Sequence, residues 1–160
     1  MTELKTFAVR VYSAPGVSDA CLALQDEQAV DVPLMLFAGW YGVHAGVMPD
    51  EVFEPAQQLS QQLGQNLIYP LRRIRRWMKN GLDDDHWHQL REAIKRNELD
   101  AELMLLAQLQ QRFAPSSVNS GPDVLPDVLS NMLRCVAQPD RLTARNRLQL
   151  EQIAAACVQA

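Results

Sequence analysis

Residues 32–43 read VPLMLFAGWYGV, and this apolar run decides how the chain is expected to fold. Apolar side chains occupy nearly every helical position in it, as in a helix that is buried on all sides. Asp31 precedes the run as an N-cap, and Pro33 suits the first turn, where its missing N–H is not needed. About a dozen residues are too few to cross a bilayer, which takes about 20. The run therefore predicts the central helix of a bundle.

Helical periodicity continues on both sides of this run, and no segment shows the sustained period-2 alternation of a β-strand. Leu4, Phe7 and Val11, for example, recur at intervals of three and four residues. Ser18 and Asp50 are the expected caps of two helices. Gly64 and Pro70 predict a break or kink in the helical segment between residues 64 and 70. Before the central helix, two helices are predicted over residues 4–13 and about 19–27. After it, one helix begins at residue 50, a second begins at residue 67 or 70 and ends at 79, and a third begins within residues 83–85 and ends at about 113. The last two helices are predicted over roughly 126–137 and 142–158.

The predicted fold class is therefore all-α, a compact single-domain bundle of seven or eight helices around a central apolar helix. A chain of 160 residues suits one domain over 1–160. Within it we expect a main bundle over 1–113, a Pro- and Ser-rich loop over 114–122, and a C-terminal helical pair over 123–160.

Composition and cysteine usage narrow the class of protein further. The net charge of -4 disfavours a whole-protein nucleic-acid binder. Cys21, Cys135 and Cys157 form no CxxC pair and are expected to be buried thiols in a reducing compartment. The N-terminus lacks a basic start followed by an apolar run, so no secretory signal is expected. These features predict a cytoplasmic protein without a transmembrane segment.

The most distinctive segment is LIYPLRRIRRWMKN, residues 67–80. Its apolar stripe, with Leu71 and Ile74, is expected to pack against the central helix. Its cations, five in eight residues, are the candidate binding residues for an anion or an acidic partner: Arg72, Arg73, Arg75, Arg76 and Lys79. Free guanidinium groups grip carboxylates and phosphates bidentately. The alternative is a solvated amphipathic helix, some of whose arginines pair with acids elsewhere in the chain, namely Asp26, Glu27 or Asp31. A membrane-surface role is a further alternative, although the helix lacks the bulky exposed apolar side that such helices usually show.

Residues around the central helix are candidates for a pocket or for ion pairing with these arginines. Gln25, Asp26 and Asp31 flank the turn before the helix, and acids close to a core element favour a cationic partner. One of the two carboxylates could instead act as a base. Trp40 and Tyr41, near the end of the helix, either line a pocket or belong to the packed core.

The sequence contains no pattern typical of a catalytic or cofactor site. Asp84 and His88 are four residues apart and could share a helix face, but a third metal ligand is not evident, so the acids at 83–85 are better explained as helix-capping residues. The glycine-rich phosphate loops and the GxSxG motif are absent. No catalytic residue, cofactor or metal ligand is therefore predicted.

Two stretches resemble a known family. Residues 7–42, FAVRVYSAPGVSDACLALQDEQAVDVPLMLFAGWYG, and 69–79, YPLRRIRRWMK, resemble a proteobacterial family of conserved proteins of about this size and of unknown function. The chain departs from that family's pattern at Pro33, where the pattern has Asn, and at Met35 and Met78, where it has Leu. The resemblance covers about the first half of the chain. It implies an all-helical fold and a bacterial cytoplasmic setting, and it implies no activity.

Three hypotheses for function follow. The first is a non-enzymatic binding or adaptor protein that uses the basic helix to engage an acidic partner. The second is an enzyme or binder of a small phosphorylated or carboxylated ligand, with arginines as the anion clamp and Asp26 or Asp31 as base. The third and less favoured one is nucleic-acid binding, whose affinity would fall steeply with salt.

Overall fold

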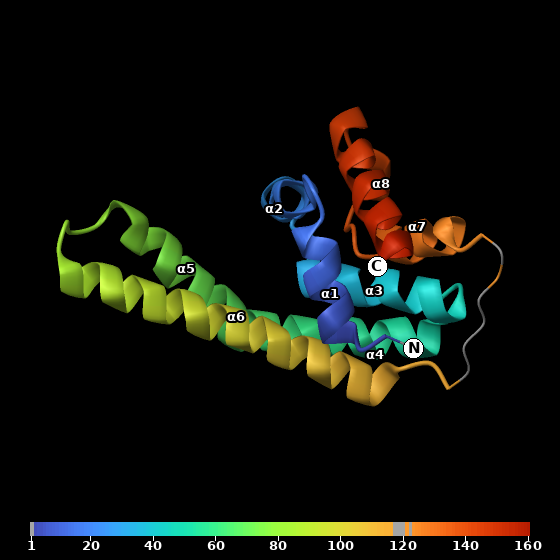
Figure 1. Ribbon diagram of the computed structural model, residues 1–160, viewed down its shortest axis with the longest axis horizontal. Coiled ribbons are helices and arrows are strands. Elements are labelled where there is room, and N and C mark those ends of the chain that lie inside the picture. Colours follow the sequence, from blue (N-terminus) through green and yellow to red (C-terminus); the bar gives the residue numbers. More distant parts are fainter. Residues whose placement is uncertain (1, 117–120, 122) are drawn as a thin grey trace.

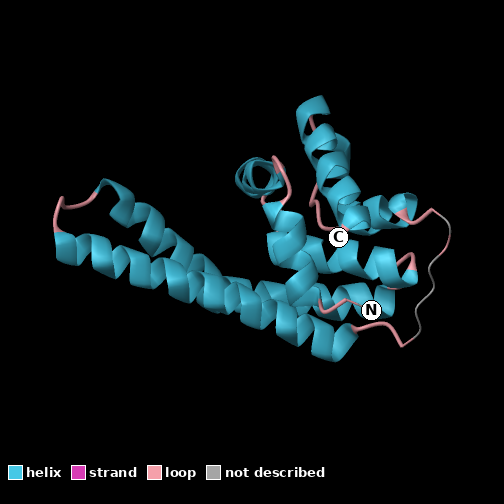
Figure 2. Ribbon diagram, viewed as in Figure 1, coloured by secondary structure: helices cyan, strands magenta, loops and turns pink. Residues whose placement is uncertain are grey.

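The computed structural model describes residues 2–116, 121 and 123–160, and every regular element within them is a helix (Figure 2). The all-α prediction is therefore confirmed. The α-helices of the described residues are labelled in Figure 1: α1 (Leu4–Ser13), α2 (Val17–Gln28), α3 (Val32–Ala45), α4 (Asp50–Leu63), α5 (Tyr69–Trp77), α6 (Asp85–Phe113), α7 (Leu125–Leu133) and α8 (Ala144–Gln159). The expected loop over 114–122 falls partly outside the described residues, since 117–120 and 122 do not belong to them.

Helix α3 is the centre of the bundle, as its sequence predicts. Nearly all of its side chains are buried, and it packs against α1, α4, α6, α7 and α8. The Asp31 side chain caps it by accepting a hydrogen bond from the Leu34 backbone N–H at 3.1 Å. Hydrophobic burial on every face of one helix holds the surrounding helices together.

Helices α5 and α6 form an antiparallel hairpin, and the end at which the two helices are joined extends beyond the other helices (Figure 1). We call the hairpin over residues 69–98 the arm. The irregularity expected between Gly64 and Pro70 is a π-helical turn over Gly64–Ile68 that leads directly into α5. At about 1.5 Å per residue, the 29 residues of α6 span roughly 43 Å.

The expectation that α5 packs its Leu71 and Ile74 stripe on the central helix is wrong. Helix α5 packs along α6 instead, and Ile74 remains 43% exposed. Leu71 is partly buried against the core, so only this part of the stripe meets the body of the protein.

Several helix boundaries also differ from those expected, among them the following three. Helix α2 begins at Val17, and its N-cap is Gly16, whose φ of 76° suits a residue without Cβ, so Ser18 lies inside the helix. Helix α4 begins at Asp50 itself, after Pro49. Helix α7 ends at Leu133, before the predicted Ala137. Among the described residues, no helix combines the length and the apolar character that crossing a membrane requires.

The Asp31→Ala variant is expected to lower the free energy of unfolding by about 1 kcal/mol. Besides capping α3, the Asp31 carboxylate accepts a hydrogen bond at 2.7 Å from the buried Ser60 hydroxyl, which the variant leaves without this acceptor. Urea unfolding measures the loss. Glu51→Ala, an exposed first-turn acid of α4, is the control and should change stability by less than about 0.5 kcal/mol. Equal losses in the two variants would show that Asp31 is not a structural cap.

Candidate functional site

The cations of α5 divide between two neighbouring helices. Arg72 and Arg75 turn toward α6, whereas Arg76 reaches across to α2. Arg75 and Arg76 lie three and four residues after Arg72, so on the helix they flank Arg72 on opposite sides and diverge toward different neighbours. The basic helix is therefore not a uniform positive surface.

Toward α6, two arginines share one buried carboxylate. Glu98 accepts from Arg72 Nε at 2.9 Å and from Arg75 Nε, and its side chain is 8% exposed. Arg72 also donates to Glu102, one turn further along α6, and its guanidinium carbon lies 5.7 Å from the centre of the Tyr69 ring. The expected pairing of some arginines with Asp26, Glu27 or Asp31 is formed by Arg76 and Asp26, whereas Arg72 and Arg75 pair with acids of α6. These two guanidinium groups are structural ion-pair partners within the molecule.

The two glutamates of this cluster have opposite pKa shifts. Burial favours the neutral form of Glu98, but the hydrogen bonds and charges of Arg75 and Arg72 outweigh it and lower the pKa of this carboxyl. Burial raises the pKa of Glu102, and Arg72 only partly offsets that effect. Glu98 is therefore the charged centre of the cluster, and Glu102 is held less firmly in its ionised form.

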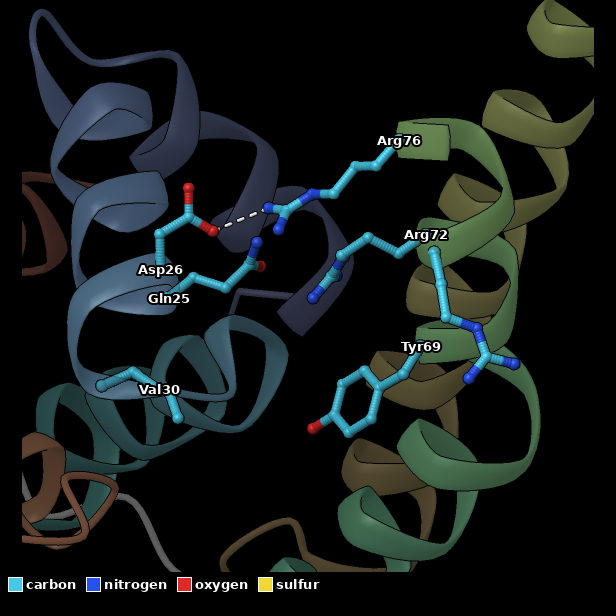
Figure 3. Close-up of a pocket in the computed structure, with 8 residues that line it drawn as sticks. Gln25, Asp26, Val30, Tyr69, Arg72 and Arg76 are labelled. Atoms are coloured by element: carbon cyan, nitrogen blue, oxygen red, sulfur yellow. Dashed lines mark hydrogen bonds and ion pairs between the residues drawn. The ribbon is translucent and has the colours of Figure 1, made fainter. Parts of the chain in front are cut away.

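Toward α2, Arg76 lines an open pocket of about 390 Å³ (Figure 3). The figure shows its guanidinium reaching from α5 to Asp26 on α2, and the two groups are joined by a hydrogen bond of 2.7 Å. Both partners are about half exposed, at 50% and 53%. Gln25 stands beside Asp26, and Arg73 also lines the pocket. Arg73 is exposed and forms no ion pair within the described residues.

Tyr69 joins this pocket to the cap of α3. Its ring lines the pocket, and its hydroxyl donates a hydrogen bond to Asp31 at 3.2 Å. Burial, followed by the nearby Asp31 carboxylate, raises the pKa of Tyr69 to about 12, so the phenol stays protonated at neutral pH. Asp31 itself does not line the pocket, and its oxygens accept from Leu34, Ser60 and Tyr69. It positions Tyr69 and α3.

The remaining candidate residues lie apart from this pocket. Trp40 and Tyr41 are buried in the core and line neither this pocket nor the larger groove described below. The Trp40 indole N–H donates to the Thr2 carbonyl at 2.8 Å. Lys79 is exposed, in the short 3₁₀ turn after α5. The structure thus brings together Gln25, Asp26, Arg72, Arg73 and Arg76, and it places Arg75, Lys79, Asp31, Trp40 and Tyr41 outside their pocket.

The acids at residues 83–85 act at the start of α6. Asp84 caps the helix by accepting from the backbone N–H groups of His86 and Trp87, and His88 faces Asp83 at 3.3 Å. Within the residues that the structure describes, no group of three or more potential ligands is placed to hold a metal ion. The cysteines are free thiols, and burial raises the pKa of Cys21 to about 12, far from that of a reactive thiol.

Sequence reasoning missed the two glutamates that decide which arginines are available. Glu98 and Glu102 are four residues apart on one face of α6, and Arg72 and Arg75 are three apart on α5. Such matched spacings on adjacent helices are the signal that could have found them. These spacings identify the ion pairs only once α5 and α6 are known to be neighbours.

Fold and site together define an all-α protein in which a helical arm meets the body at an arginine–carboxylate cluster beside an open cationic pocket. The chain belongs to the family described as Protein of unknown function (DUF2390), whose model matches residues 3–109. This confirms the expected kind of family. The matched segment contains every residue that lines the pocket and the ion-pair cluster. Comparisons with curated proteins and with solved structures found no match.

Proposed function

We propose that the chain is a non-enzymatic binding or adaptor protein of the bacterial cytoplasm that holds an acidic group of a partner protein in the pocket between α2 and α5. The observation that carries this proposal is the convergence of Arg73, Arg76 and Tyr69 on one open pocket, with one carboxylate, Asp26, opposite them. The bacterial and cytoplasmic setting rests on the sequence resemblance.

The ion pairing of the arginines allows an anion from a partner protein to replace Asp26 on Arg76. Arg76 is bound to Asp26 in a half-exposed ion pair, and such surface pairs contribute only about 0–1 kcal/mol. A carboxylate or phosphate brought in by a partner can therefore replace Asp26 at little cost. Arg73 adds a second guanidinium with no ion pair within the described residues, and two such groups can hold an anion bidentately. Arg72 and Arg75 stay on Glu98 and fix the helix that presents the other two.

The pocket's volume supports one alternative, a small phosphorylated or carboxylated ligand. About 390 Å³ falls in the range of small-molecule sites, and the pocket is concave as those sites are. The chemistry recognised is the same in both cases, an anionic oxygen cluster on guanidinium groups. The following test separates the two.

Binding is expected to depend on Arg73 and Arg76. A fluorescent hexaglutamate peptide, followed by polarisation, should bind the double variant Arg73→Glu/Arg76→Glu at least tenfold more weakly than the unsubstituted chain, because both guanidinium groups are lost. Asp26→Asn should bind the peptide several-fold more tightly, because it removes the internal competitor while keeping the side-chain shape.

The matched control is Arg141→Glu/Arg147→Glu, which changes charge equally at two exposed arginines outside the pocket. Equal weakening in both double variants would reduce the effect to net charge and contradict a specific site. Stabilisation by inorganic phosphate without peptide binding would favour the small-ligand alternative. Tight binding of a DNA or RNA duplex that collapses with added salt would favour nucleic acid instead. Capture from an extract of the source cells, analysed by mass spectrometry, then compares the same variants to find the natural partner.

A further inference from the structure

A second, larger hollow of about 680 Å³ lies between α1 and α2 on one side and α6 on the other. We call it the groove. Apolar side chains along it are open to solvent: Val9 is 56% exposed, Leu22 44% and Leu99 53%. Large apolar side chains that gather along one hollow mark a surface that another apolar group covers. The groove shares Arg72 and Gln25 with the pocket between α2 and α5, which we call the anion pocket, but the walls of the groove are mainly apolar.

The groove's charged groups leave a positive rim. On its floor, Arg72 and Arg75 are bound to Glu98. At the rim, Lys95 and Arg96 are exposed, and Arg96 forms no ion pair in the part of the chain that the structure describes. Lys95 lies 3.8 Å from Glu92, which is a weak surface contact. A partner suited to this groove therefore has apolar side chains next to carboxylates.

The tip of the arm, residues 77–87, has this complementary character. Trp77 is 71% exposed and Leu82 is 66% exposed, and the Trp77 ring has its centre 5.6 Å from that of Trp87. Asp83 and Asp85 flank this apolar knob, and both are exposed. Tryptophan is enriched among the residues that contribute most of the binding energy at protein interfaces. The chain thus carries both halves of one contact, a knob with acids and a groove with cations.

The position of tip and groove on the same hairpin allows both contacts to form at once. The tip lies at the far end of the arm (Figure 1). The groove is lined by residues further along α6, from Glu92 to Leu106. Two arms that run antiparallel bring each tip to the other copy's groove, and such an exchange closes into a two-fold dimer.

We propose that a second copy of this chain occupies the groove, so that Trp77 and Leu82 of each copy cover Leu22 and Leu99 of the other. In this arrangement Asp83 and Asp85 face Lys95 and Arg96. The dimer does not depend on binding in the anion pocket, so failure of one proposal would not contradict the other.

Sedimentation velocity of the full-length chain, between about 1 and 200 µM, tests the proposal, because a dimer's population follows mass action. The mass is expected to rise with concentration from one copy of 18.0 kDa to two. The tip variant Leu82→Asp and the groove variant Leu99→Asp should each raise the dimer dissociation constant at least tenfold. Val9→Asp is a second groove variant in case Leu99→Asp alters α6. The control is Leu148→Asp on α8, since Leu148 is as exposed as Leu82 and should leave dimerisation unchanged.

Mixing the tip variant with the groove variant identifies which surfaces touch. A mixed pair loses one contact but keeps the other, so the mixture should dimerise more tightly than either variant alone. A mixture that stays monomeric like its components would overturn the reciprocal contact. An unsubstituted chain that stays monomeric at about 200 µM, or one that grows beyond two copies, would overturn the proposal as well.

Discussion

The Glu98→Gln variant is expected to unfold with a free energy about 3 kcal/mol lower than that of the unsubstituted chain. Glu98 is nearly buried and accepts from both Arg72 and Arg75, which are themselves only 13% and 24% exposed. Removing its charge leaves two guanidinium groups largely removed from water without their main counter-charge. Breaking one partner of a buried ion pair costs more than the pair contributes, because the remaining charge stays desolvated.

The pH dependence of this loss has a definite sign. The pKa of Glu98 is held below its ordinary value of 4.5 in the folded chain, so the ion pairs add stability above that pH. The contribution disappears as the pH falls through the lowered folded-state pKa. The two curves of unfolding free energy against pH should therefore differ most near neutral pH and converge as the pH falls below the lowered pKa of Glu98.

Glu102→Gln is the matched control for this prediction. Glu102 binds the same Arg72 from the next turn of α6, but its side chain is 27% exposed and burial raises its pKa. The folded chain thus favours the protonated carboxyl of Glu102 more than the unfolded chain does. The stability that this preference gives is lost as the pH rises through the folded-state pKa. At neutral pH the amide should cost less than about 1 kcal/mol. Similar losses in the two variants, measured by urea unfolding, would contradict the central role of Glu98.

The sequence predicts the body of the fold well because that part depends on burial and capping. Residues 32–43 have only one stable environment, the centre of a bundle, and Asp31 caps them as expected. The start of α6 at the acids of residues 83–85 follows from the same local chemistry, in which a carboxylate satisfies free backbone N–H groups. Features determined by nearby residues can be predicted from the sequence to within a residue or two, since Gly16 caps α2 in place of Ser18 and Pro49 caps α4 in place of Asp50.

The partners of the arginines could not be predicted in this way. Glu98 lies 26 residues after Arg72, and their contact depends on α5 folding back along α6 and not onto α3. The charge pattern of residues 72–79 is the same in both arrangements, but the number of available cations differs. Of the candidate pairings with Asp26, Glu27 and Asp31, the structure forms one, between Arg76 and Asp26. Glu27 instead accepts from Asn146 on α8.

This pairing makes the candidate site smaller than the sequence predicts. Arg72 and Arg75 hold the root of the arm, while Arg73 and Arg76 lie at the pocket. Loss of the first pair should act on stability, and loss of the second on binding. The two kinds of variant can therefore be told apart in one experiment that measures unfolding and peptide binding together.

The Gly42→Ala variant is expected to lower the free energy of unfolding by about 2 kcal/mol. Helices α3 and α7 cross so closely at Gly42 that a Cβ there would lie 2.8 Å from Val128 Cα and 2.9 Å from Val128 N. These are backbone atoms of α7, so the helix itself must move to make room. Moving it disturbs the contacts of α7 with α3 and α8, although alanine alone favours a helix over glycine by about 1 kcal/mol.

Gly39→Ala separates this clash from the general effect of adding a methyl group. Gly39 lies one turn earlier in α3, and its Cβ would meet the Cys157 sulfur at 2.8 Å and the Met132 sulfur at 3.6 Å, both on side chains. Side chains can shift more easily than the backbone of a packed helix, so Gly39→Ala should cost less than Gly42→Ala in urea unfolding. A larger loss of unfolding free energy in Gly39→Ala than in Gly42→Ala would mean that α7 moves away from α3 more easily than the side chains around Cys157 rearrange. In that case α7 would not be fixed against the central helix by this close approach.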